Sequence, residues 1–242
     1  MINMPENAAE KLLFALDVDA LAKATPFIEA LSPYVGCFKI GLELMNAVGT
    51  PQAVQHVLRH GGQVFADCKL NDIPNTVRGA SRVIAGMGVK YFNVHASSGI
   101  EAIKAAAEEK GSSKLLVVTV LTSLDDAASQ TIFGKTAREK VLDFAKEALE
   151  GGADGLICSP QELELLGPLP EFKNLLKITP GIRPSWAQSD DQKRTMTPKE
   201  AIQAGATHLV IGRPISNPPR GIGSPIDAAK AILEEISSCQ PR

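Results

Sequence analysis

Short apolar runs rich in β-branched residues alternate with helical segments along the whole chain, and this alternation constrains the fold more than any other feature. The apolar runs lie at residues 12–17, 37–40, 63–69, 91–95, 115–121, 155–159, 176–180 and 209–212. Segments with helical spacing follow them, at residues 20–31, 50–60, 77–87, 99–109, 136–150, 160–166, 198–204 and 225–237. Nearly continuous apolar strands joined by helices are typical of a parallel sheet that is covered on both faces.

Eight such units in 242 residues favour a closed (β/α)8 barrel, the TIM-barrel fold, over an open doubly wound sheet. A flavodoxin-like open sheet is the alternative, but that fold usually needs only about five or six strands. Glycines that precede several of the strands, such as Gly61 and Gly151, suit helix ends that lead into short loops. No segment resembles a linker, so we expect one domain over residues 1–242, with short flexible ends at about 1–10 and 238–242.

Charge and composition exclude several classes of function. The net charge of −2 and the pI of about 6.1 give no electrostatic footprint for nucleic acid or an anionic membrane. Residues 1–10 lack the basic and then apolar plan of a signal peptide, and no apolar run approaches the roughly 20 residues of a membrane helix. The four cysteines are scattered, without metal-ligand spacing or a disulfide framework. We therefore expect a cytoplasmic protein with neither a nucleic-acid nor a membrane partner.

Charges of alternating sign gather where the third apolar run ends, in residues 67–72. Side chains alternate along a strand, so Asp67 and Lys69 should point to one face and Cys68 to the other. Asp72 is followed two positions later by a proline, which is typical of a helix that starts with an aspartate cap. A surface ion pair beside a capping aspartate is the simpler interpretation, because such pairs are worth only about 0–1 kcal/mol and need no function.

The ends of the other runs carry more polar side chains. In a (β/α)8 barrel the active site forms at the carboxyl ends of the strands, from residues of several strands. Those ends supply Asp17, Lys39, Asp67, Lys69, Asp72, Asn93, His95, Thr122, Ser123, Arg183, Gly212 and Arg213. The opposite ends supply no comparable set, so one face of the expected barrel concentrates the charge, which favours an active site over a surface ion pair. His95 suits a structural role inside the barrel at least as well as a catalytic one.

The alternating charges favour a protonated lysine at the centre of this site. A carboxylate within about 4–6 Å of an ammonium favours the charged form of both groups, so Lys69, between Asp67 and Asp72, should stay protonated. A Schiff-base lysine needs a neutral amine, and a metal would need the place that the ammonium already fills. A substrate carboxylate about 4 Å from Asp67 would be repelled by roughly 4 kcal/mol at an effective dielectric of about 20. Loss of CO2 relieves that repulsion and leaves a carbanion beside Lys69, so the cluster suits decarboxylation.

The last two strand ends are typical of a phosphate site. Gly212 permits close approach of the backbone, and Arg213 offers a guanidinium for bidentate binding of an oxyanion. The loops after strands seven and eight commonly hold phosphate in this fold. Residues 181–197 form a long polar segment, and a loop beyond about 12–15 residues is usually a lid or a binding loop. A solvated surface loop is the alternative for that segment.

Taken in order along the chain, these motifs resemble the orotidine 5′-phosphate decarboxylase family. The resemblance runs from about Leu13 to Asp227 and rests on Ala15-Leu16-Asp17, Phe38-Lys39-Ile40-Gly41, Asp67-x-Lys69-x-x-Asp72-Ile73-Pro74-Asn75-Thr76, Asn93-Val94-His95, Val120-Leu121-Thr122-Ser123, Thr179-Pro180-Gly181-Ile182-Arg183, Asp191-Gln192-x-Arg194 and Ile211-Gly212-Arg213. The Asp-x-Lys-x-x-Asp element alone is shared with sugar-phosphate decarboxylases and synthases of the same superfamily. The Asp-Ile-Pro-Asn-Thr extension and the Asp-Gln-x-Arg segment together are specific to the orotidylate family. Cys68 departs from the leucine that is common there, but it is expected to face away from the site.

The resemblance implies a reaction and a set of site residues. Members convert orotidine 5′-phosphate to UMP and CO2 in de novo pyrimidine biosynthesis, with no cofactor and no metal. It implies that Lys69 donates a proton to C6 of the pyrimidine, within a catalytic array of Lys39, Asp67, Lys69 and Asp72. The implied contacts are Asp17 and Lys39 with the ribose, Thr122 with the pyrimidine, and Gln192, Gly212 and Arg213 with the phosphate, with Arg183 near them in a closing lid. The implied substrate-binding residues are Asp17, Lys39, Asp67, Cys68, Lys69, Leu70, Asn71, Asp72, Ile73, Pro74, Asn75, Thr76, Thr122, Arg183, Gln192, Gly212 and Arg213.

The resemblance also implies a homodimer whose active sites lie at the subunit interface, where Asp72 and Thr76 reach into the neighbouring subunit's site. Two alternatives stay open from the sequence. A sugar-phosphate decarboxylase or synthase of the same superfamily would depend on Mg²⁺ and lose activity with a chelator. A catalytically silent phosphate-binding barrel would bind UMP without any turnover.

Overall fold

The computed structural model describes residues 6–187 and 195–239, and in them eight parallel strands form a closed barrel in the order of the sequence. The strands are β1 (Leu12–Ala15), β2 (Cys37–Ile40), β3 (Val64–Leu70), β4 (Tyr91–His95), β5 (Lys114–Val118), β6 (Gly155–Ile157), β7 (Leu176–Thr179) and β8 (His208–Ile211). The barrel closes where β8 pairs with β1, with Val210 opposite Leu13. The predicted (β/α)8 barrel is confirmed, and the open flavodoxin-like sheet is wrong.

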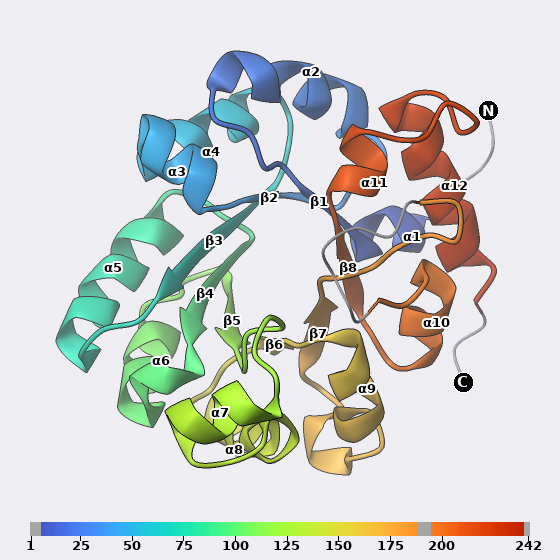
Figure 1. Ribbon diagram of the computed structural model, residues 1–242. Coiled ribbons are helices and arrows are strands. Elements are labelled where there is room, and N and C mark those ends of the chain that lie inside the picture. Colours follow the sequence, from blue (N-terminus) through green and yellow to red (C-terminus); the bar gives the residue numbers. More distant parts are fainter. Residues whose placement is uncertain (1–5, 188–194, 240–242) are drawn as a thin grey trace.

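Helices surround the barrel on all sides (Figure 1). They are α1 (Glu6–Lys11), α2 (Leu21–Leu31), α3 (Leu42–Val48), α4 (Thr50–Arg59), α5 (Pro74–Gly86), α6 (Ile100–Glu108), α7 (Asp126–Phe133), α8 (Ala137–Glu150), α9 (Pro160–Leu166), α10 (Pro198–Gln203), α11 (Arg213–Ser216) and α12 (Pro225–Ser237), with 3₁₀ turns η1 (Ala96–Ser98) and η2 (Pro170–Phe172). The sequence prediction lacked α1, α3, α7 and α11, each of which has only 4–8 residues. No described helix is long and apolar enough to cross a membrane.

The predicted flexible ends fall partly outside the described residues. Of the stretch at 1–10, residues 6–10 belong to α1, which contacts α12 and strands β1 and β8. At the other end, α12 runs to Ser237, and residues 240–242 lie outside the described part of the chain.

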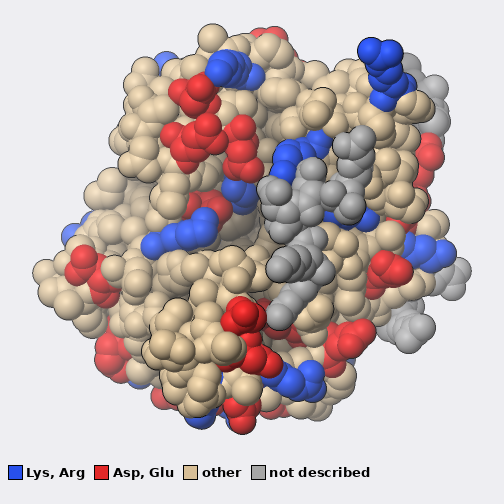
Figure 2. Space-filling model, in the orientation of Figure 1, with Lys and Arg blue, Asp and Glu red and all other residues tan. Residues whose placement is uncertain are grey.

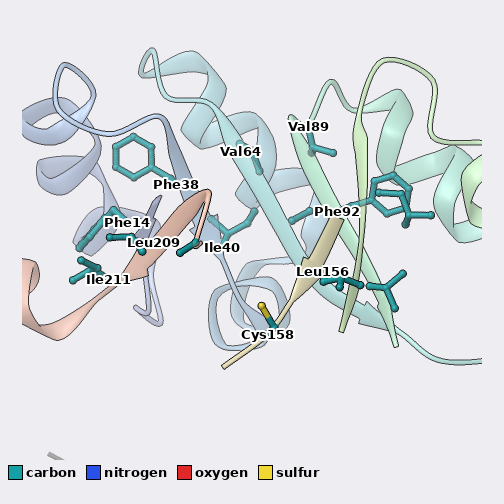
Figure 3. Packing of buried hydrophobic residues seen from close by; sticks show 14 of the residues in the cluster. Phe14, Phe38, Ile40, Val64, Val89, Phe92, Leu156, Cys158, Leu209 and Ile211 are labelled. Carbon is teal, nitrogen blue, oxygen red and sulfur yellow. The ribbon is translucent and has the colours of Figure 1, made fainter. Parts of the chain in front are cut away.

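The core has two layers because strand side chains alternate between the outside and the inside of the barrel. Phe14, Phe38 and Phe92 point outward and are buried beneath the helices (Figure 3). The rings of Phe14 and Phe38 meet edge to face, with centroids 6.1 Å apart. The inner layer fills the barrel with Leu13, Ala15, Cys37, Phe65, Tyr91, Leu116, Ile178 and Val210.

The same alternation places the charged residues at one mouth of the barrel. Inward-facing Ala15 is followed two positions later by Asp17, and inward-facing Phe65 is followed by Asp67. On β2, Lys39 likewise follows the inward-facing Cys37. Apolar side chains therefore fill the barrel interior, and the next inward positions at the carboxyl ends of the strands carry the charges.

Candidate active site

A cavity of about 290 Å³ opens at the carboxyl ends of the strands. It is lined by Ala15, Asp17, Lys39, Phe65, Asp67, Lys69, Val118, Val120, Leu121, Thr122, Ile157, Cys158, Pro180, Gly181, Arg183, Val210, Gly212 and Arg213. Figure 2 shows side chains of both charges around a hollow near the middle of this face. The cavity is therefore polar along part of its wall and closed below by the apolar barrel interior.

The structure brings eight of the predicted site residues to this cavity: Asp17, Lys39, Asp67, Lys69, Thr122, Arg183, Gly212 and Arg213. Eight others lie along the chain beside it and do not line it: Cys68, Leu70, Asn71, Asp72, Ile73, Pro74, Asn75 and Thr76. Gln192 lies outside the described residues, as does the rest of the segment 188–194. The sequence reasoning did not select the apolar wall, including Phe65 and Val210, although inward alternation at the strand ends could have indicated it.

Asp67 is the centre of a chain of alternating charges. Its Oδ1 atom lies 2.6 Å from the Lys69 ammonium nitrogen, and its Oδ2 atom lies 3.3 Å from that of Lys39. The Lys39 ammonium nitrogen also lies 3.2 Å from Oδ1 of Asp17. Asp67 is only 8% exposed, so its carboxylate is removed from water and depends on these two cations. The predicted contact between Asp67 and Lys69 is present.

The environment favours the charged forms of Asp67 and Lys39. Burial acts to raise the pKa of the Asp67 carboxyl, but Lys39, Lys69 and the hydrogen bonds outweigh it, and the pKa lies below its ordinary value. Burial likewise acts to lower the pKa of Lys39, and Asp67 and Asp17 together raise it above its ordinary value. His95 is half-buried, and burial followed by the nearby Lys69 charge lowers its pKa, so its imidazole is neutral at pH 7.

The backbone of β3 departs from a regular strand within this site. Ala66 pairs with Phe92, but Leu70 pairs with Val94, so β3 holds two more residues than β4 between these points. Lys69 has a φ of 50° and is the only non-glycine residue in the described chain with a positive φ. Lys69 therefore contacts Asp67 because the backbone is irregular here. The regular alternation of side chains along a strand, which the sequence prediction used, does not explain the contact. Cys68 packs against the outer core, away from the cavity, as predicted.

Asp72 does not cap the following helix, so this part of the sequence prediction is wrong. Helix α5 begins at Pro74, and Ile73 occupies the cap position without a side-chain hydrogen bond. The Asp72 carboxylate accepts a hydrogen bond from the Ile73 N–H at 2.7 Å. A capping side chain would instead accept from an N–H inside the first turn of the helix. The structure gives Lys69 an ion pair with Asp67 and, within the described single chain, none with Asp72. Both Asp72 and Ile73 are exposed.

The described ends of the long loop after β7 are joined to each other. Ile182 forms an isolated parallel bridge with Met196, and the Arg183 N–H donates to the Met196 carbonyl at 2.9 Å. Beyond β8, a side chain on Gly212 would place its Cβ only 3.1 Å from the Ala15 Cβ and 3.8 Å from Oδ2 of Asp17. Glycine at this position thus keeps the wall open between the predicted phosphate end of the cavity and Asp17.

No cluster of three or more His, Cys, Asp or Glu side chains suited to a metal ion occurs within residues 6–187 and 195–239. The described carboxylates of the cavity are instead engaged with lysines. The arrangement holds the carboxylate of Asp67 and the amine of Lys69 within hydrogen-bond distance at the bottom of the cavity. Arg213 also lines this cavity.

Comparison with known proteins gives a consistent result. Residues 10–230 match the model of the Orotidine 5′-phosphate decarboxylase / HUMPS family. The orotidine 5′-phosphate decarboxylase of Moorella thermoacetica is 43% identical, over 98% of this chain and 95% of its own. The orotidine 5′-phosphate decarboxylase of Trichlorobacter lovleyi is 44% identical to this chain, over 96% of this chain and 97% of its own length. The crystal structure of orotidine 5′-phosphate decarboxylase from Lactobacillus acidophilus superposes with a TM-score of 0.78, at 31% identity, over 94% of this chain and 99% of that one.

The lowered pKa of Asp67 predicts how its contribution to stability depends on pH. A carboxyl whose folded pKa lies below the unfolded value near 3.8 stabilises the fold above that value, and the contribution is lost as the pH falls through the folded pKa. The free energy of unfolding should therefore be higher for the wild type than for Asp67→Asn near neutral pH, and the difference should narrow below about pH 4. Urea unfolding of both proteins at a series of pH values measures this difference in the free energy of unfolding.

Asp19→Asn is the matched control for this measurement, because Asp19 forms an exposed ion pair with Lys23. Its effect should be small at every pH. A difference between wild type and Asp67→Asn that stayed constant down to pH 3 would contradict the account of Asp67.

Proposed function

This chain belongs to the orotidine 5′-phosphate decarboxylase / HUMPS family and catalyses the decarboxylation of orotidine 5′-phosphate to UMP, and we propose how its residues divide that work. The observation that supports the proposal best is the chain of charges from Asp17 through Lys39 and Asp67 to Lys69, set at the bottom of the mouth cavity. The product is a pyrimidine nucleotide, so the reaction serves pyrimidine biosynthesis. The reaction is that of a small-molecule metabolic enzyme, and we place it in the cytoplasm.

The substrate lies across the mouth with its phosphate over the ends of β7 and β8. Arg213 and the backbone of half-buried Gly212 bind the phosphate oxygens, and Arg183 also lines the cavity. Asp17 and Lys39, which are 3.2 Å apart, bind the ribose hydroxyls. Thr122 lines the wall near the pyrimidine. This orientation brings the ring carbon that carries the carboxylate to the end of the cavity where Asp67 and Lys69 lie.

Asp67 and Lys69 then act on the reacting carbon in opposite ways. The ionised Asp67 faces the substrate carboxylate, and two such charges about 4 Å apart repel by roughly 4 kcal/mol at an effective dielectric of about 20. The bond from C6 to the carboxyl carbon breaks, CO2 leaves, and the electron pair stays on C6. The Lys69 ammonium stabilises that pair and transfers a proton to C6, and the neutral amine is protonated again from solvent.

Charge repulsion alone is too small to account for the lowering of the reaction barrier. Enzymes lower barriers by about 8–23 kcal/mol, and one repulsion of about 4 kcal/mol covers only part of this range. The remainder comes from interactions that strengthen as the carbanion forms, above all with Lys69, and from binding of the phosphate and ribose far from the reacting carbon. In this proposal, Arg213 binds the phosphate at one end of the cavity, and the lysine–aspartate pair acts on the reacting carbon at the other end.

The proposal is tested directly by following the loss of orotidine 5′-phosphate through its ultraviolet absorbance, with EDTA present. Turnover should be unaffected by the chelator, because every charged group in the scheme belongs to the protein or the substrate. Lys69→Ala should lose the activity, since it removes the proposed proton donor, and it should still bind UMP. Loss of wild-type turnover with EDTA would favour a Mg²⁺-dependent sugar-phosphate relative, and UMP binding without turnover in the wild type would favour a silent barrel.

Arg213→Ala tests the phosphate end of the scheme. A hydrogen bond to a charged group is worth about 1.5–3 kcal/mol, so kcat/KM for orotidine 5′-phosphate should fall at least about tenfold. Steady-state kinetics measures the change. Arg59→Ala is the control, because Arg59 is an exposed arginine at the end of α4, and its kcat/KM should equal that of the wild type. An unchanged kcat/KM in Arg213→Ala would rule out this phosphate site.

The chain acts as a homodimer in this proposal, with Asp72 and Thr76 completing the active site of the neighbouring subunit. Two observations support it. In the single chain Asp72 is exposed and lacks an ion pair with Lys69, although a charged array needs it nearby. The adjacent Ile73 is 66% exposed, which is unusual for an isoleucine next to an active site and suits a surface that is covered by a second subunit.

Mixing two inactive variants tests the shared site. Lys69→Ala and Asp72→Ala should each be inactive, because each removes one component from every site. When the two are mixed and allowed to exchange subunits, half of the dimers become mixed, and each mixed dimer holds one intact site. Activity should return to about a quarter of the wild-type value per subunit. A mixture that stays inactive while analytical methods show mixed dimers would place Asp72 in its own subunit's site.

A further inference from the structure

The irregular end of β3 faces a single side chain of the next strand. Asp67, Cys68 and Lys69 are the three residues of β3 between its pairings with Phe92 and Val94, where β4 has only one residue. The residue of β4 between those two is Asn93, which is only 1% exposed. The irregular segment therefore packs against Asn93 and is shielded from solvent there.

Asn93 bonds to every residue of this segment. Its side-chain oxygen accepts the Lys69 backbone N–H at 2.7 Å, and its side-chain nitrogen donates to Oδ1 of Asp67 at 2.7 Å. Its backbone carbonyl accepts the Cys68 thiol at 3.5 Å. The amide has one correct orientation, because turning it over would put its NH2 group against the Lys69 N–H and its oxygen against a carboxylate. Both polar groups of the Asn93 amide, its oxygen and its NH2, are thus hydrogen-bonded to this segment.

These contacts bear on the two residues that the reaction needs most. Lys69 has a left-handed backbone conformation, which is costly for a residue with a side chain and persists only where the surroundings enforce it. The hydrogen bond from its N–H to Asn93 holds that conformation. Oδ1 of Asp67 receives the Asn93 NH2 group and the Lys69 ammonium together, at 2.7 Å and 2.6 Å.

We propose that Asn93 is a positioning residue, whose one amide fixes the Asp67 carboxylate and the Lys69 backbone relative to each other so that the lysine ammonium meets the reacting carbon. Asn93 does not line the cavity and is not placed to touch the substrate. Its effect should therefore fall on the chemical step and not on binding of the ribose and phosphate. This inference rests on the proposed roles of Asp67 and Lys69.

Asn93→Ala removes both hydrogen bonds of the amide. Because a displacement of about 1 Å at a catalytic group can cost about a hundredfold in rate, kcat should fall by about that factor. The dissociation constant of UMP should change by less than about threefold, since the phosphate and ribose contacts are untouched. Asn93→Asp keeps the shape and the acceptor for the Lys69 N–H but replaces the donor to Asp67 by a repelling oxygen, so it should lose at least about tenfold in kcat as well.

Ser113→Ala is the matched control for a general loss of packing. Ser113 is also a buried polar residue, 2% exposed, and it donates to the Val89 carbonyl at the opposite end of the barrel. It should lower the melting temperature while leaving kcat within about threefold of the wild type. The proposal is overturned if the Asn93 variants lose no more kcat than Ser113→Ala, or if they lose UMP binding in parallel with kcat. Should Asn93→Ala fail to fold, Asn93→Asp decides the question by the same comparison.

A crystal structure of an Asn93 variant separates this inference from the proposed function. We expect Lys69 to relax to a negative φ and the distance between its ammonium and Oδ1 of Asp67 to lengthen. If Lys69 and Asp67 keep their geometry without the Asn93 amide, the inference is wrong even when the wild-type enzyme decarboxylates orotidine 5′-phosphate. If the wild type has no turnover, the proposed function fails, and the variant structure still shows whether Asn93 positions the pair.

Discussion

The buried carboxylate of Asp67 is the interaction on which the rest of the mouth depends. Removing a carboxylate from water is costly, and the cost is met only if cations and hydrogen-bond donors surround it. Lys39 and Lys69 supply the charges, one on each carboxylate oxygen, and Asp17 in turn balances Lys39. Replacing such a cluster by apolar residues of similar volume is often neutral or stabilising in other proteins. A cluster of this kind therefore need not be present for stability, which supports the chemical use that we propose.

The barrel determines where this cluster can be built. Within a closed parallel sheet, inward-facing residues two positions apart follow one another from the packed interior to the mouth, so a strand end can present a charge directly above an apolar layer. Phe65 below Asp67 is an example, because the ring closes the cavity beneath the carboxylate. A low-polarity floor strengthens every electrostatic interaction above it. The apolar interior thus contributes to the chemistry as well as to the fold.

The sequence predicts the barrel and the charged residues of the cavity because both follow from periodic patterns. Alternating strands and helices determine the fold class, and reading only the strand ends collects Asp17, Lys39 and Asp67. The prediction fails where the backbone departs from the pattern. Asp72 was interpreted as a cap, but α5 begins at Pro74 and Ile73 occupies the cap position. Asn93 was collected with the strand ends but given no specific role, because its role depends on what it faces across the strand pair, and no period in the sequence encodes that.

The positive φ of Lys69 shows why a regular strand would not serve this site. In a regular strand, Asp67 and Lys69 would project side by side into the barrel mouth, with the chain running straight on. The two additional residues turn the chain, so that Lys69 reaches back to Asp67 at 2.6 Å while the backbone leads outward to the exposed residues 71–76. One local irregularity therefore accompanies two features: the ammonium lies on the carboxylate, and Asp72 is exposed and forms no ion pair with Lys69 in the described chain. If Asp72 completes the neighbouring subunit's site as proposed, such a break lets the chain present that aspartate outward while its own lysine stays in place.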